Sequence, residues 1–137
     1  MEISNLKNGF MKRMIFLFLL LTGAFASFAQ VSPVKFKTLK YSFGNIKLGV
    51  PATTKFDFTN ISDRPVVIEV ATADCGCTSP DYPQAPILKG KTADIKVTYN
   101  AEVPGHFDKK ITVKFANVAQ PVILEIDGNV VAKDAKG

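Results

Sequence analysis

Short stretches in which apolar and polar residues alternate are the feature that most constrains how this chain can fold. Phe56 and Phe58 alternate with charged and hydroxyl residues, and Ile95 and Val97 do so later in the sequence. The same period of two recurs at Val34 and Phe36, at Tyr41 and Phe43, at Val66, Ile68 and Val70, at Ile111, Val113 and Phe115, and at Val122, Leu124, Ile126 and Val130. Because successive side chains of a strand point to opposite faces, each stretch predicts a strand with one buried face. The chain is therefore predicted to be all-β, with about seven strands.

Clusters of Gly, Pro and Asn separate these stretches, and no helical period interrupts them. Short strands with such turns between them are typical of an immunoglobulin-like antiparallel β-sandwich, and a small barrel is the alternative. The chain has no Trp and its two cysteines are one residue apart, which argues against the inter-sheet disulfide of antibody domains. The residues expected to face one core are Phe56, Phe58, Ile68, Ile95, Val97, Val113, Leu124 and Ile126.

The first 29 residues predict a cleaved signal peptide. A basic segment that ends at Lys12 and Arg13 precedes an apolar run over residues 14–21, and small residues follow it. The run is far shorter than the roughly 20 residues that a membrane span needs. The pattern Ser27-Phe28-Ala29 favours cleavage before Gln30, with Ala24-Phe25-Ala26 before Ser27 as the alternative, and no cysteine lies near either site to carry a lipid. We therefore expect an exported protein, periplasmic or extracellular, that is not a lipoprotein and has no stable membrane insertion after cleavage.

The charge balance argues against nucleic acid as a partner. The chain carries 17 basic and 12 acidic residues, a net charge of +5. Three of the basic residues and one of the acidic residues lie in the signal peptide, so the net charge of residues 30–137 falls to +3. Their lysines alternate with Asp, Glu and Thr and form no patch, which is typical of a solvated surface. Residues 30–137 are predicted to form one domain, large enough to bury a core of its own.

Residues 73–89 are the least regular part of this domain. Pro80, Pro83 and Pro86 exclude an ordinary central strand and predict a shaped loop between two strands. Loops on a rigid sandwich are where binding residues gather. The candidate interaction residues in this loop are Asp74, Gly76, Thr78 and Tyr82.

The same loop contains Cys75 and Cys77, the pair with the most distinctive chemistry. Residues i and i+2 of an extended strand are roughly 6.6 Å apart at Cα, near the upper limit for a disulfide, so Gly76 is expected to supply a kink. The pair can then be a small disulfide that shapes the loop, a redox-active dithiol or a soft-metal clip. Redox activity requires a lowered thiol pKa, which the adjacent Asp74 opposes unless a lysine or Arg64 approaches in space.

A metal site has three candidate ligands, Cys75, Cys77 and His106. Two thiolates suit Cu(I) or Zn(II), and His106 is the single imidazole of the chain. A closed zinc site lacks an obvious fourth ligand, and a histidine directly after Pro104-Gly105 is typical of a solvated turn. We therefore expect no cofactor, with Cu(I) or Zn as the alternative.

Catalytic residues are not predicted. The carboxylates of Asp74, Asp81, Glu102 and Asp108 fall in expected loops, without a second histidine or a nucleophile motif beside them. A glycine-rich phosphate loop is also missing from the sequence. The chain is therefore expected to be a non-enzyme.

A set of short motifs resembles a bacterial exported domain-of-unknown-function family, number 1573, which is frequent in Bacteroidetes. These motifs are Phe43-Gly44-Asn45-Ile46, Gly49, Phe56-Asp57-Phe58-Thr59-Asn60, Cys75-Gly76-Cys77-Thr78, Gly105 and Ile126-Asp127-Gly128-Asn129-Val130. The resemblance covers residues 34–131 and implies an immunoglobulin-like sandwich similar to major-sperm-protein, PapD and ASH domains. It implies no established activity. The chain departs from the family at Leu88-Lys89-Gly90, where a Pro-Gly turn is usual.

The function expected from these features is that of an exported, non-enzymatic binding or scaffold domain. Its partner is expected to be an envelope protein that the sequence does not identify. The alternative is a thiol redox or Cu(I)-handling protein that uses Cys75 and Cys77.

Overall fold

The computed structural model describes residues 31–132, so the predicted signal peptide (residues 1–29) and cleavage before Gln30 lie outside the described residues. Its strands are β1 (Val34–Phe36), β2 (Lys40–Lys47), β3 (Ala52–Asn60), β4 (Ile68–Ala73), β5 (Thr78–Asp81), β6 (Thr92–Tyr99), β7 (Gly105–Phe115) and β8 (Val122–Val131). No helix within residues 31–132 is long and apolar enough to cross a membrane.

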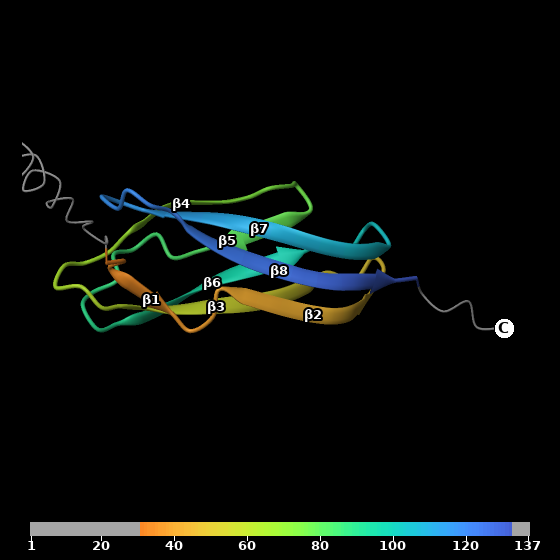
Figure 1. The fold of residues 1–137 in the computed structure, drawn as a ribbon, viewed down its shortest axis with the longest axis horizontal. Helices are drawn as coiled ribbons and strands as arrows, with labels where there is room; N and C mark the ends of the chain where they lie inside the picture. The colour runs from red at the N-terminus through yellow and green to blue at the C-terminus, as the bar shows by residue number, and fades with distance from the viewer. Residues whose placement is uncertain (1–30, 133–137) are drawn as a thin grey trace, which may run out of the picture. The chain divides into compact units, whose positions relative to one another are not determined.

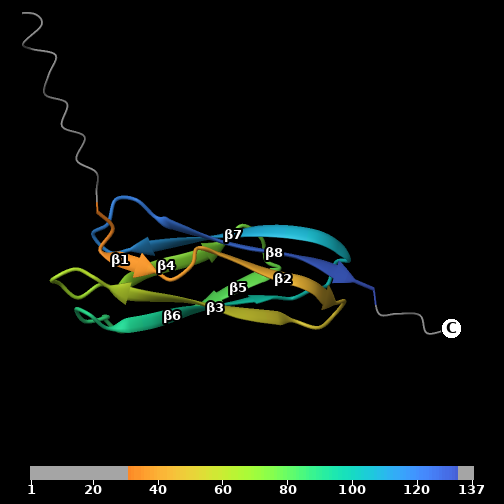
Figure 2. The same ribbon diagram turned by 60° about the horizontal axis from the view of Figure 1, so that its bottom comes forward.

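The strands form two four-stranded sheets that enclose one core (Figures 1 and 2). One sheet has the order β1-β3-β6-β5 and the other the order β2-β8-β7-β4. The predicted all-β, immunoglobulin-like sandwich is confirmed.

The sheets are not purely antiparallel, which corrects the predicted pairing. β2 runs parallel to β8, whereas β1, just before β2 in the chain, runs antiparallel to β3 in the other sheet. The N-terminal part of the domain therefore changes sheets between Phe36 and Lys40 while keeping its direction. A bulge between Ser42 and Asn45, where Gly44 has φ +64°, then bends β2 along β8.

An eighth strand lies inside the predicted loop over residues 73–89. β5 pairs antiparallel with β6 at the edge of its sheet, and Pro80 lies within it. Proline lacks an N–H, so an edge strand is where a sheet tolerates it. The exclusion of a central strand was therefore right, but the interpretation of the whole segment as a loop was wrong.

All eight residues predicted for the core are buried. Ile68 is 2% exposed, and Phe56, Phe58, Ile95, Val97, Val113, Leu124 and Ile126 are fully buried. The ring of Phe58 lies 5.1 Å from that of Phe36 and 5.5 Å from that of Phe115, centroid to centroid. Both sheets thus contribute aromatic rings to one apolar layer.

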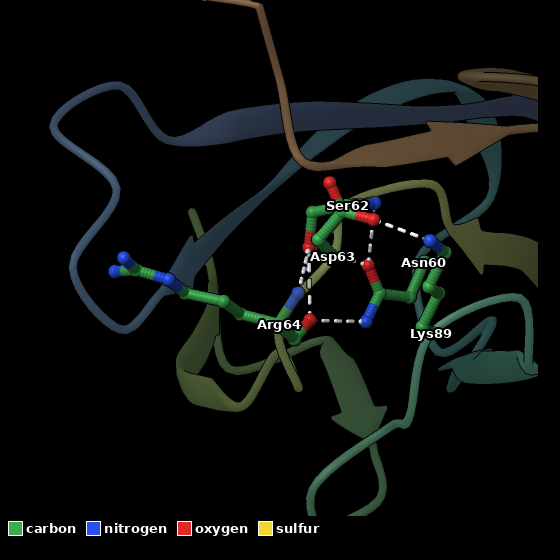
Figure 3. A network of polar contacts seen from close by, with 5 residues as sticks. All are labelled: Asn60, Ser62, Asp63, Arg64 and Lys89. Carbon is green, nitrogen blue, oxygen red and sulfur yellow. Dashed lines mark hydrogen bonds and ion pairs between the residues drawn. The ribbon is translucent and has the colours of Figure 1, made fainter.

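One polar side chain, that of Asn60, is fully buried within the described core. Its amide nitrogen donates to the carbonyl oxygens of Arg64 at 2.7 Å and Ile87 at 2.9 Å. Its amide oxygen accepts from the backbone N–H and the hydroxyl of Ser62. Figure 3 shows the part of this network that joins Asn60 to Ser62 and Arg64, with the Lys89–Asp63 ion pair beside it. Asn60 therefore joins the β3–β4 turn to the segment that leads into β6.

Candidate functional site

The cysteine loop, defined here as residues 74–77, crosses from β4 of one sheet to β5 of the other (Figure 1). Cys75 and Cys77 are joined by a disulfide, with their Cα atoms 5.2 Å apart. Gly76 between them is exposed, and its φ is outside the left-handed region. The 5.2 Å spacing is shorter than the roughly 6.6 Å of an extended strand, so the expected kink is present, but it does not require a left-handed φ at Gly76.

Hydrogen bonds fix the loop at both ends. The N–H of Asp74 donates to the carbonyl of Lys110 at 3.1 Å, and the N–H of Lys110 donates to the carboxylate of Asp74 at 3.2 Å. The Asp74 side chain thus takes the place of a backbone carbonyl at the end of the β4–β7 ladder. After the loop, the carbonyl of Cys77 accepts from the N–H of Asn100 at 3.0 Å.

Thr78 was predicted as an interaction residue, but its side chain is only 5% exposed. Its hydroxyl oxygen lies 3.7 Å from the sulfur of Cys75 and 3.8 Å from that of Cys77. Because Thr78 begins β5 opposite Tyr99, strand alternation turns it toward the core. Thr78 packs against the disulfide and is not part of the exposed surface.

Tyr82 lies beyond the other end of β5 from the cysteine loop. It is partly buried and lines a surface pocket of about 400 Å³. The pocket is also lined by Lys55, Asp81, Pro83, Ala93, Asp94 and Lys96. Lys55 pairs with Asp94 at 3.3 Å and Lys96 with Asp81 at 3.5 Å, so each ammonium already has a carboxylate. Of the predicted interaction residues, Asp74 and Gly76 are therefore exposed on the cysteine loop. Thr78 is buried next to the disulfide, and Tyr82 lies beyond the far end of β5.

The structure does not bring His106 to the cysteines. His106 lies on β7 opposite Asn129, one residue from Phe107, whose ring is in the core. Alternation along β7 therefore places His106 on the outer face of its sheet. Among residues 31–132, no three His, Cys, Asp or Glu side chains are arranged to hold a metal ion.

Arg64 is also remote from the cysteines. It belongs to the turn that Asn60 organises, next to the Thr59–Thr92 pair of the β3–β6 ladder. The cysteine loop lies near the opposite end of that ladder, where Ala52 pairs with Tyr99. Arg64 is therefore not the cation that redox chemistry would need.

The outer face of the β2-β8-β7-β4 sheet contains the described groups with perturbed titration. Hydrogen bonds from Ser42 and then from Lys40 lower the pKa of Asp127, and the Asp127 carboxylate raises the pKa of Lys40. The Lys40–Asp127 ion pair spans 3.1 Å. This exposed pair crosses the parallel β2–β8 contact and is not next to the cysteine loop.

Comparison with known proteins supports the fold and leaves the activity open. No curated protein matches the sequence. The human CEP192 ASH/PapD-like domain 7 is similar in structure, with a TM-score of 0.64 and 7% identity over 74% of this chain and 87% of that one.

Two other solved structures share the fold. A protein of unknown function from Porphyromonas gingivalis W83 has a TM-score of 0.62 and 10% identity, over 76% of this chain and 51% of its own. The YadV chaperone has a TM-score of 0.54 and 13% identity, over 77% of this chain and 55% of its own. The chain thus spans about half the length of these two proteins. The model of the family described as protein of unknown function DUF1573 matches residues 34–130, and the chain belongs to this family.

Proposed function

We propose that this protein is an exported, non-enzymatic binding domain whose interaction surface is built around the cysteine loop. The observation that carries the proposal is that the loop is both exposed and held in one conformation. Asp74 and Gly76 are exposed, while the disulfide and the hydrogen bonds to Lys110 and Asn100 fix the backbone on either side. A loop that is ordered before binding loses little conformational entropy when a partner docks.

The strands on either side of the loop support the same proposal. β4 and β5 are the terminal strands of their sheets, so each has backbone groups without a neighbouring strand in the described domain. Such an edge can accept an extended segment of another protein as an additional strand. Pro80 removes one N–H from β5, so β4, with its exposed Val70 and Thr72, is the better edge.

The chemistry of the surface favours a protein partner. Nucleic acid would require a basic patch, whereas four exposed lysines of the sheets, Lys40, Lys55, Lys96 and Lys114, each pair with a carboxylate. The YadV structure, which shares the fold, is named as a chaperone, and this is consistent with a fold that binds other polypeptides. The predicted signal peptide supports a partner in the cell envelope or outside the cell.

Affinity capture from the native envelope with Gly76→Trp as the blocking variant tests the proposal. A Cβ at Gly76 meets no heavy atom within 4 Å, so the substitution should leave the fold intact while obstructing the loop. Lys91→Trp is the matched control, because Lys91 is exposed at the end of β6 remote from the loop. A partner retained by the parent and by Lys91→Trp, but lost with Gly76→Trp, supports the proposal. Equal retention by all three proteins would show that the loop is not the interaction surface.

A further inference from the structure

The β4–β7 ladder ends close to the disulfide. Ala73 pairs with Ile111, Asp74 is tied to Lys110 by two hydrogen bonds, and Cys75 and Lys109 are the next residues of the two segments beyond this end of the ladder. Lys109 alternates with the buried Phe107 and Ile111, and its side chain therefore starts on the inner face of the sheet. Cys75, two residues beyond the end of β4, is also partly buried.

The charges around Cys75 differ from what the local sequence indicates. Asp74 and Lys110 belong to the opposite face, and the carboxylate of Asp74 already accepts the N–H of Lys110. Lys109 is partly buried, and within residues 31–132 no carboxylate lies within 4.0 Å of its ammonium. The Lys109 ammonium is therefore not neutralised by an ion pair within the described residues.

The two cysteines have different surroundings. Cys77 packs against the hydrophobic core, whereas Cys75, which is also partly buried, is not part of that packing. The hydroxyl of Thr78 lies at nearly equal distances from both sulfurs and can donate a hydrogen bond to a thiolate on either. The disulfide encloses a single residue, so it restricts the unfolded chain very little and stabilises the fold weakly.

We propose that Cys75 and Cys77 form a thiol–disulfide exchange site for cysteine-containing partners, in which Cys75 carries the mixed disulfide and Lys109 stabilises its thiolate. The partner class is a protein dithiol or a small thiol. This inference goes beyond the binding function and does not depend on it.

A partner dithiol supplies both of the electrons that reduce the Cys75–Cys77 disulfide, so the exchange needs no other reductant. One partner thiolate attacks the Cys75 sulfur, the Cys75–Cys77 bond breaks, and Cys77 leaves as a thiolate that takes up a proton. The second partner thiolate then attacks the partner sulfur of the mixed disulfide, and Cys75 leaves as a thiolate next to the Lys109 ammonium. The partner is oxidised to a disulfide by two electrons, and Cys75 and Cys77 are reduced to a dithiol.

The first test uses glutathione as the probe on the exported protein. Across a glutathione redox series, thiol counting should show a two-electron transition between disulfide and dithiol within the range that this couple buffers. Cys77→Ser should trap one glutathione on Cys75 when mixed with oxidised glutathione, and should do so faster than Cys75→Ser traps it on Cys77. Absence of both the transition and the adduct would overturn the exchange site.

The second test isolates Lys109 in the Cys77→Ser background. Lys109→Met keeps the apolar stem and removes the charge, so it should raise the pKa of the Cys75 thiol and slow adduct formation about threefold at neutral pH. Lys109→Arg should restore the rate, and Lys110→Met, on the opposite face, is the matched control. Equal rates and equal thiolate titrations for Lys109→Met and Lys110→Met would overturn the role of Lys109. If Lys109 had only a structural role, Lys109→Met would leave the pKa of the Cys75 thiol unchanged.

Discussion

At the scale of single residues, Gly128 and Gly76 differ in the space around them. A Cβ at Gly128 would lie 2.7 Å from the Phe107 ring, which itself stacks on Tyr99 at 3.9 Å, whereas a Cβ at Gly76 meets nothing. Gly128→Ala should therefore lower the free energy of unfolding by about 1 to 3 kcal/mol, because the ring must shift within a packed core. Gly76→Ala is the matched control and should change it by less than about 1 kcal/mol. Chemical denaturation of both variants checks this, and an equal loss for the two would contradict the packing of Phe107 against Gly128.

At the scale of elements, Asn60 connects two turns that the strands alone do not hold together. Asn60→Ala removes the donors to the Arg64 and Ile87 carbonyls and the acceptor for Ser62. The Arg64 and Ile87 carbonyls keep the Ser62 hydroxyl and the Val66 N–H as partners. Since each hydrogen bond that is lost contributes about 0.5 to 1.5 kcal/mol and four are lost, the variant should lose at least about 2 kcal/mol and loosen the turn before β4. Hydrogen exchange of Ser62 and Ile87, together with denaturation, measures both effects. Asn129→Ala, which loses one exposed hydrogen bond to Asn45, should cost less than about 1 kcal/mol; similar costs for the two would show that the Asn60 network is not structural.

At the scale of the whole molecule, stability should come from the shared core and not from the disulfide. Phe58→Ala empties a fully buried site against Phe36 and Phe115 and should cost about 3 to 5 kcal/mol, while Lys96→Ala on the outer face should cost less than about 0.5 kcal/mol. The double Cys75→Ser, Cys77→Ser variant should keep the fold and lose at most about 1 to 2 kcal/mol, because the enclosed chain is so short. Denaturation midpoints under oxidising and reducing conditions rank these variants. Unfolding of the double variant, or a loss as large as that of Phe58→Ala, would contradict a fold supported by its core.

The core and every strand except β5 could be predicted from the sequence alone, because the alternation of side chains is a local property of an extended chain. The inward position of Lys109 had a local signal as well, since Phe107 and Ile111 flank it at the strand period. No local signal in the sequence indicated which segment lies next to Lys109 across the sheet. That the end of β4 lies beside Lys110, that Ile87 accepts a hydrogen bond from Asn60, that β2 pairs in parallel with β8 and that Thr78 turns inward are all decided by tertiary structure. Each of these contacts depends on which distant strand lies alongside. The pairing partner and direction of a strand are set by the burial of a whole sheet face, and several distant stretches of sequence contribute to that face, so no single stretch determines them.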